Sequence, residues 1–165
     1  MAEISHRVNP LFLREEELRQ GMELMLFAYR DVMAAADRTL AEHGLGRAHH
    51  RAVYFIGRHP GVSVSDLLAM LGITKQSLSR VLKELDAAGF VEIREAPTDR
   101  RKRLLALTDA GETLERALTD AQRRRFAHAY REAGAAAVEG FRQVLMALTA
   151  EEHRKLLADS ESPVP

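Results

Sequence analysis

Residues 63–89 read SVSDLLAMLGITKQSLSRVLKELDAAG, and this stretch decides the fold. Its first part predicts a short helix, capped by Ser63 or Ser65, because apolar residues recur there every three or four positions. The glycine-containing turn 72–74 follows, and a second helix is predicted from Lys75 to Ala88. The residues expected to face inward on the two helices are Val64, Leu67, Leu68, Leu71, Leu78, Val81, Leu82 and Leu85. Two helices joined by such a turn predict a helix-turn-helix.

The period of the sequence changes immediately after this stretch. Residues 90–94 (FVEIR) alternate apolar and charged side chains, as in a half-buried strand. Residues 95–102 contain Pro97 and Asp99 and are expected to form a loop, and residues 103–107 are expected to form the returning strand. The result is a two-stranded hairpin with a basic tip, so the sequence predicts a winged helix-turn-helix.

Helices are predicted on both sides of this region. Residues 11–43 carry one apolar stripe between Leu18 and Leu40, and Gly44 is placed as a left-handed cap residue. Further helices are expected at 47–58, from Asp109 to about 131, and at 133–148. A last short helix is expected to reach Leu157 after a capping box formed by Thr149 and Glu152. The fold class is therefore mainly α, with a small β-hairpin wing.

The predicted organisation has three parts. Residues 47–108 form the winged helix-turn-helix lobe, residues 11–46 and 109–158 form dimerisation helices, and residues 1–10 and 159–165 form flexible tails. The apolar stripes of residues 18–40 and 138–148 need more burial than a thin lobe can give. A two-fold dimer would bury them and would place the two second helices about 34–36 Å apart, one turn of DNA.

Composition limits the classes of protein. The chain has 165 residues, with 24 Lys and Arg against 24 Asp and Glu, so its formal net charge is zero. A neutral total argues against nucleic-acid binding, but the basic residues gather at Arg100 to Arg103. The chain has no Cys, which excludes disulfides and thiol-based sensing. The sequence has no apolar run long enough for a membrane helix and no signal-peptide pattern, so a cytoplasmic location is expected.

The outward face of the second helix in the helix-turn-helix has the chemistry of DNA recognition. Gln can bond adenine in two places, Arg can do the same with guanine, and Ser or Thr can bond bases or phosphates. Residues at the helix start are suited to phosphate. The predicted recognition residues are Thr74, Lys75, Gln76, Ser77, Ser79, Arg80 and Lys83.

The hairpin supplies a second set of candidate DNA contacts. Consecutive cations suit phosphates or a narrow minor groove, where the negative potential attracts arginine. Asp99 is expected to hold Arg101 in a fixed pose. The predicted wing residues are Asp99, Arg100, Arg101, Lys102 and Arg103. Each feature alone is more often a solvated surface, and their order and spacing together favour binding of double-stranded DNA.

The stretch 61–111 resembles the MarR family of bacterial regulators. The resemblance rests on residues 59–67 (HPGVSVSDL), 74–80 (TKQSLSR), 99–101 (DRR) and 107–111 (LTDAG), with Asp99 and Arg101 in the family's Asp-x-Arg wing signature. It implies a homodimer that binds a pseudo-palindromic operator and regulates transcription as a repressor. The apolar helix at 133–148, followed by a further short helix, departs from the family's usual C-terminal part.

The resemblance also implies a small aromatic or phenolic effector, bound between the dimerisation helices and the DNA-binding lobe. The residues expected to contribute are Tyr29, Met33, His43, His50, Tyr54 and Arg58. Each can equally be an ordinary core or surface residue. The adjacent His49 and His50 point about 100° apart on a helix and make no chelating pair, so no metal or other cofactor is expected.

Three alternatives to a ligand-controlled regulator are open at this point. No catalytic constellation, phosphate loop or metal motif has an interpretable spacing, so enzymatic activity is not expected. A winged-helix protein-interaction module would use the same fold without DNA. A constitutive regulator would bind DNA without any effector.

Overall fold

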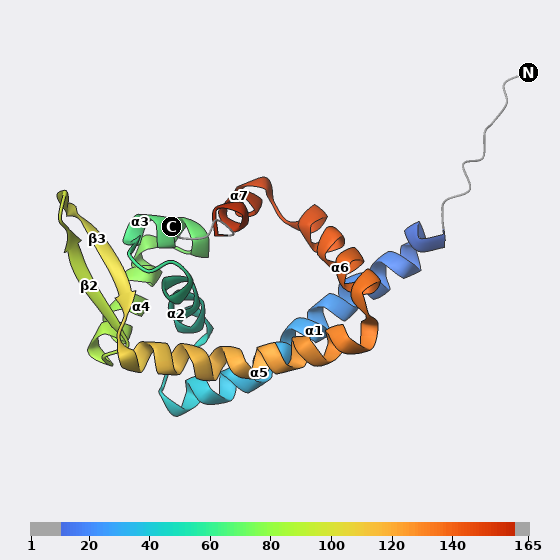
Figure 1. Ribbon diagram of the computed structural model, residues 1–165, viewed down its shortest axis with the longest axis horizontal. Coiled ribbons are helices and arrows are strands. Elements are labelled where there is room, and N and C mark those ends of the chain that lie inside the picture. Colours follow the sequence, from blue (N-terminus) through green and yellow to red (C-terminus); the bar gives the residue numbers. More distant parts are fainter. Residues whose placement is uncertain (1–10, 161–165) are drawn as a thin grey trace, which may run out of the picture.

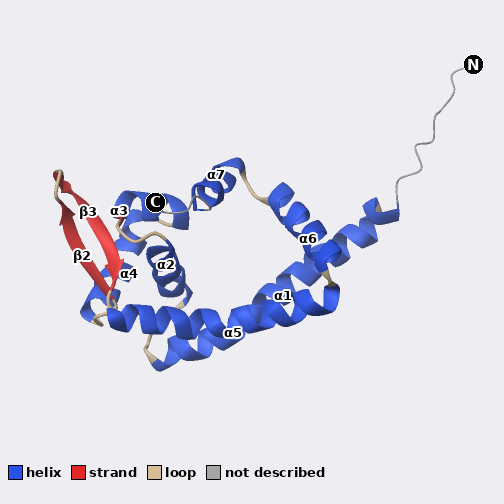
Figure 2. Cartoon of the chain, viewed as in Figure 1, coloured by secondary structure: helices blue, strands red, loops and turns tan. Residues whose placement is uncertain are grey.

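The computed structural model describes residues 11–160, which are helical apart from a small sheet (Figures 1 and 2). The elements are η1 (Leu11–Leu13), α1 (Glu15–Glu42), α2 (Arg47–Arg58), β1 (Val62–Ser63), α3 (Val64–Leu71), α4 (Lys75–Ala87), β2 (Val91–Ala96), β3 (Asp99–Leu107), α5 (Asp109–Ala133), α6 (Ala135–Leu148) and α7 (Glu151–Ser160). Within the described residues, no helix is both long and apolar enough to cross a membrane. The expected flexible tails are 1–10 and 159–165. Residues 1–10 and 161–165 lie outside the described residues, while residues 159 and 160 end α7.

The predicted helix-turn-helix is confirmed as α3 and α4. The Ser63 hydroxyl accepts the Asp66 N–H at 3.1 Å, and the Thr74 hydroxyl accepts the Ser77 N–H at 3.1 Å, so each helix has a side-chain cap. Between them Gly72 adopts a φ of +59°, a left-handed conformation that side chains with a Cβ rarely take. Local sequence chemistry therefore sets both helix starts and the turn.

The expected two-stranded hairpin is wrong in one respect, because the sheet has three antiparallel strands in the order β1-β3-β2. The additional strand is β1, where Val62 pairs with Leu105 and Ser63 with Leu104. A strand of two residues is too short to show an alternating pattern, so sequence periodicity could not reveal it.

The expected long loop at residues 95–102 is also wrong. Strand β2 continues to Ala96 and β3 already begins at Asp99, which leaves residues 97 and 98 as the turn (Figure 2). The pairing then jumps, since Ala96 pairs with Asp99 but Glu95 pairs with Arg103. Residues 100–102 are thus extra residues of β3 that bulge from the ladder. The cations lie on a bulged strand, not in a flexible loop.

The winged helix-turn-helix has a closed apolar core. It is built from buried side chains of α2, α3, α4 and all three strands: Ala52, Val53, Ile56, Val62, Leu67, Leu71, Leu78, Val81, Leu82, Leu85, Val91 and Leu105. The lobe joins α5 tightly, because the Thr108 hydroxyl donates to the Gly89 carbonyl at 2.6 Å. A Cβ on Gly111 would lie 1.9 Å from the Phe90 carbonyl oxygen, so this contact requires glycine.

The long helices α1, α5, α6 and α7 form a second, more open region, the scaffold. Helix α1 lies along α5, and at the end of α5 the chain turns back through α6 and α7 (Figure 1). The shared core of α1 and α5 lies next to the lobe, where the second half of α1 meets the start of α5. It holds Met33, Ala36 and Leu40 of α1 and Leu114 and Leu118 of α5. All of residues 11–31 are exposed, and α6 has no buried residue. The helices predicted from periodicity are present, but most of their apolar surface is uncovered within one chain.

Candidate nucleic-acid interface

Helix α4 presents a continuous polar face away from the core. Leu78, Val81, Leu82 and Leu85 are buried, as predicted. Gln76, Arg80 and Lys83 lie on the opposite side and are exposed, with Lys75 and Ser79 exposed beside them. Within residues 11–160, none of these five side chains makes a hydrogen bond or ion pair. Their polar groups are therefore available to a ligand.

The first turn of α4 is held more tightly than the rest of this face. The Thr74 hydroxyl donates to the Ser77 hydroxyl at 2.9 Å, in addition to accepting the Ser77 N–H. Ser77 is half-buried, whereas Thr74 is exposed. Both residues thus fix the start of the helix, and Thr74 remains at the surface.

The wing carries a second polar surface. The Asp99 carboxylate accepts the Arg101 backbone N–H at 3.0 Å and the Arg101 Nε–H at 3.2 Å, which links the two residues as expected. Both hydrogen bonds favour the ionised carboxylate, and the bond from the backbone N–H has the larger effect. They therefore hold the pKa of Asp99 below its usual range. The Arg101 side chain is nevertheless 92% exposed, and Arg100, Lys102 and Arg103 are also exposed. Strand β3 therefore presents four cations to the surroundings, three in the bulge and Arg103 directly after it.

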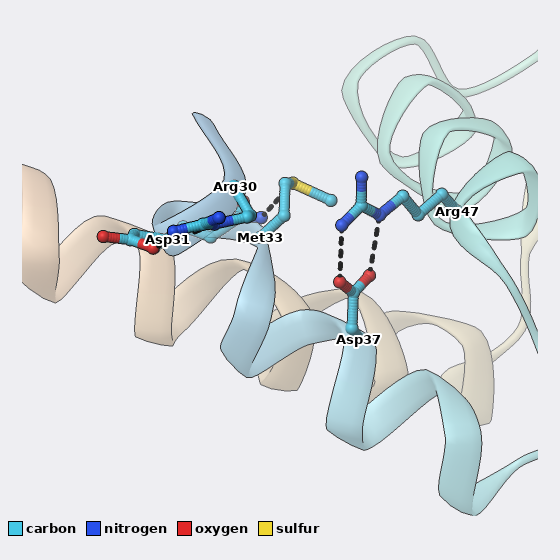
Figure 3. A network of polar contacts seen from close by, with 6 residues as sticks. Arg30, Asp31, Met33, Asp37 and Arg47 are labelled. Carbon is cyan, nitrogen blue, oxygen red and sulfur yellow. Dashed lines mark hydrogen bonds and ion pairs between the residues drawn. The ribbon is translucent and has the colours of Figure 1, made fainter. Parts of the chain in front are cut away.

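An ion pair joins the scaffold to the lobe at the start of α2 (Figure 3). Asp37 on α1 accepts two hydrogen bonds from Arg47, one from Nε at 3.0 Å and one from Nη2 at 2.7 Å. The bond to Arg47 lowers the pKa of Asp37 and, conversely, raises the pKa of Arg47. The Arg47 guanidinium also lies 5.8 Å from the centre of the Tyr29 ring.

Five of the six residues expected to bind an effector lie on α1 and α2, and His43 directly follows α1. Tyr29, Tyr54 and Arg58 are exposed, while Met33 is buried and its sulfur lies 3.1 Å from the Gln122 amide nitrogen. His43 lines a cavity of about 460 Å³ together with Thr39, Phe90, Asp109, Ala110, Thr113, Leu114 and Ala117, and none of the other five lines it. The single chain therefore does not gather the six residues around one cavity.

His50 is the one member of this set that is polar and deeply buried. Its side chain is 6% exposed, and its Nδ1 has no hydrogen-bond partner among the described residues. Burial lowers the pKa of His50, although Asp37 and Glu115 oppose the shift. Burial therefore favours the neutral form of the ring.

The pair of His49 on α2 and Glu84 on α4 is not predicted from the sequence, where His49 is considered only as a metal ligand. His49 Nε2 lies 2.6 Å from Glu84 Oε2, and His49 Nδ1 accepts the Gly46 N–H at 3.1 Å. No sequence pattern links positions 49 and 84, because the contact depends on how α2 packs against α4. No cluster of three His, Cys, Asp or Glu residues suited to a metal occurs in the part of the chain that is described.

Comparisons with known proteins agree with this geometry. The model of the MarR family matches residues 43–102. The chain is 52% identical over 154 residues to the HTH-type transcriptional regulator PetP of Rhodobacter capsulatus, covering 92% of this chain and 93% of PetP.

Two solved structures share the fold at lower identity. Streptococcus pneumoniae FabT in complex with DNA has a TM-score of 0.69 and 18% identity, covering 86% of this chain and 98% of FabT. NadR in complex with 4-hydroxyphenylacetate has a TM-score of 0.65 and 21% identity, covering 79% of this chain and 91% of NadR.

The fold and these matches define a transcription regulator with a winged helix DNA-binding fold, and not an enzyme. More specifically, the chain belongs to the MarR family.

Proposed function

We propose that the chain is a homodimeric repressor that binds a pseudo-palindromic operator through residues 47–108. The observation that carries this proposal is the uncovered face of α4, where Gln76, Arg80 and Lys83 have no partner within residues 11–160. Unsatisfied, exposed amide and guanidinium groups on a capped helix are suited to base edges in the major groove. Because the target is DNA, we also propose that the protein acts in the cytoplasm.

Each part of the lobe has its own task in this proposal. Gln76 and Arg80 read bases, while Thr74, Lys75, Ser77, Ser79 and Lys83 bond bases or nearby phosphates. The bulged cations of β3 reach phosphates or the adjacent minor groove, with Asp99 orienting Arg101 by the two hydrogen bonds described above. FabT, a protein of the same fold, is seen bound to DNA, which supports this use of the fold.

The homodimer is proposed from the apolar surface of the scaffold. On α1, Leu18, Met22, Leu24, Met25, Leu26 and Phe27 are each at least half exposed. Val144 and Leu148 on α6 are exposed to a similar degree. Leaving one such side chain in water forgoes about 1.5–3 kcal/mol of burial, so a second copy of residues 11–46 and 109–158 would stabilise the scaffold substantially.

We further propose that a small aromatic or phenolic compound releases the operator. The expected effector residues lie on α1 and α2 or, for His43, directly after α1, where scaffold and lobe connect, so a ligand there could change the spacing of the two lobes. These residues are Tyr29, Met33, His43, His50, Tyr54 and Arg58. NadR, which has the same fold, binds 4-hydroxyphenylacetate and so offers a precedent for this class of ligand.

A gel-shift titration against the DNA upstream of the protein's own gene tests the proposal, with random DNA as competitor. A discrete complex that survives the competitor is expected, and its affinity should fall steeply with salt because phosphates are contacted. Equal affinity for upstream and random DNA would contradict a specific operator at that site. No affinity for any duplex would favour a winged-helix protein-interaction module.

Two substitutions separate base reading from phosphate binding. Arg80→Ala is expected to cost about 1–3 kcal/mol on the operator and much less on random DNA, because it removes a base contact. Arg101→Ala is expected to weaken both and to reduce the slope of affinity against salt. Similar losses on both DNAs after Arg80→Ala would make Arg80 a phosphate contact instead.

A further inference from the structure

A chain of two hydrogen bonds runs from the α1–α2 connection to the recognition helix. The Gly46 N–H donates to His49 Nδ1 at 3.1 Å, and His49 Nε2 lies 2.6 Å from Glu84 Oε2 on α4. A backbone N–H can only donate, so Nδ1 must be the unprotonated acceptor and Nε2 must carry the ring proton. His49 is thus a neutral ring that donates to a carboxylate, and its side chain is only 12% exposed.

Glu84 occupies a sensitive position on α4. It lies four residues after Arg80, and side chains four residues apart are neighbours on a helix surface. A carboxylate and a guanidinium at that spacing attract each other. Yet Arg80 has no ion pair within residues 11–160, and the Glu84 carboxylate lies against His49 instead.

We propose that His49 is a positioning residue for DNA recognition, because it holds the Glu84 carboxylate away from Arg80 and leaves that guanidinium free to bond a base. The inference rests on the proposed function and adds a residue outside the recognition helix that controls its specificity. Without the His49 bond, Glu84 competes with the operator for Arg80. It also brings an unpaired negative charge next to the DNA phosphates.

The expected effect is moderate. An exposed ion pair between residues i and i+4 shifts an equilibrium by about twofold. Loss of a hydrogen bond to a charged group also frees α4 to change its angle against α2. Together these effects should lower affinity for the operator by about threefold to tenfold. Affinity for random DNA should change less, since phosphate contacts dominate it.

A matched pair of substitutions separates the two hydrogen bonds of His49. Asn can replace Nδ1 as the acceptor for Gly46 but cannot reach Glu84, whereas Gln can place an N–H near the position of Nε2. Full-length His49→Asn and His49→Gln are titrated with a duplex selected by the wild-type protein from a pool of randomised duplexes, and with random DNA. His49→Asn should bind the operator about threefold to tenfold more weakly than the wild type. His49→Gln should bind it as tightly as the wild type.

Removal of the competing carboxylate provides the decisive comparison. In the double variant His49→Asn/Glu84→Ala, operator affinity should return towards that of the wild type, because nothing is left to capture Arg80. A purely structural role predicts the opposite, a double variant that binds no better than His49→Asn. Thermal unfolding of each variant reports any loss of stability separately.

A control variant tests whether the effect is specific to this pair. His128 and Glu132 form an exposed pair within α5, with 3.5 Å between Nε2 and Oε1, and His128→Asn should leave operator affinity unchanged. Equal operator affinity of the wild type and His49→Asn would overturn the inference while leaving the regulator intact. Selection that enriches no sequence would instead overturn the proposed function, and the inference with it.

Discussion

The two halves of the molecule, the winged helix-turn-helix lobe and the scaffold, differ in how completely they bury their apolar side chains. In the winged helix-turn-helix, twelve apolar side chains from α2, α3, α4 and the sheet are buried against one another within the chain. In the scaffold, the shared core of α1 and α5 holds five such residues next to the lobe, and residues 15–31 of α1 are all exposed. The contrast shows that the lobe buries its apolar core within one chain, and the exposed apolar residues of the scaffold support the proposed homodimer.

The largest expected effect comes from opening the closed core. Leu67 on α3 is fully buried, so Leu67→Ala should lower the free energy of unfolding by about 2–5 kcal/mol, through lost burial and a cavity. Urea denaturation followed by circular dichroism measures the loss. Ser65→Ala on the exposed side of the same helix is the control, with an expected change within about 0.5 kcal/mol.

In the scaffold, a charge introduced on α1 should weaken association of two chains. Leu26 on α1 is 67% exposed in the single chain, so Leu26→Asp would be harmless to a monomer. If a second copy covers α1, the substitution buries an unpaired carboxylate twice and should weaken association by roughly 3 kcal/mol. Light scattering after size exclusion measures the dimer–monomer equilibrium.

Leu26→Met is the matched control, because it keeps an apolar side chain of similar volume and should preserve the dimer. A wild-type protein that is monomeric at every concentration would contradict the proposal that a second copy covers the scaffold. So would a Leu26→Asp variant that dimerises as tightly as the wild type.

The contact between the lobe and the start of α5 should tolerate no added side-chain atoms. Gly111 at the start of α5 abuts the Phe90 backbone, and an added Cβ would lie 1.9 Å from the Phe90 oxygen. Gly111→Ala must push α5 away from the start of β2 and should cost about 1–3 kcal/mol of stability by overpacking. Gly140→Ala on α6 has open space around it and should be neutral or slightly stabilising, so equal effects at the two positions would contradict the close approach.

The sequence was most informative where local chemistry decides the structure. The caps at Ser63 and Thr74, the turn at Gly72 and the buried face of α4 all depend on residues close in the chain, and all were predictable. The same holds for Gly44, whose φ is +67°. These elements also hold the expected recognition residues, so the polar face of α4 could be derived before its geometry was known.

Features that depend on distant contacts were not predictable. The pairing of β1 with β3, the bulge at residues 100–102 and the bond from His49 to Glu84 each join segments that no short-range pattern connects. Local patterns can also compete. Thr149 was expected to cap α7, but its hydroxyl donates to the Leu145 carbonyl at 2.8 Å and closes α6, while α7 begins at Glu151.

The smallest expected effect concerns the ion pair that links the two halves. Asp37 on α1 and Arg47 on α2 are partly exposed, so solvent screens their attraction, and Asp37→Asn should destabilise the protein only slightly at neutral pH. The bond to Arg47 lowers the pKa of Asp37 below its ordinary value of 3.8. Folding therefore favours the ionised carboxylate, and the stabilisation is fully present above about pH 3.8.

The sign of this shift fixes how the stabilisation must vary with pH. As the pH falls below 3.8, Asp37 takes up a proton more readily in the unfolded chain than in the folded one, so the advantage of the wild type over Asp37→Asn should shrink. Urea denaturation of both proteins over a series of pH values measures the difference. A gap of the same size in acid as at neutral pH would mean that Asp37 acts through packing and not through its charge. Asp120→Asn, which alters a pair confined to α5, should leave the coupling between scaffold and lobe unaffected.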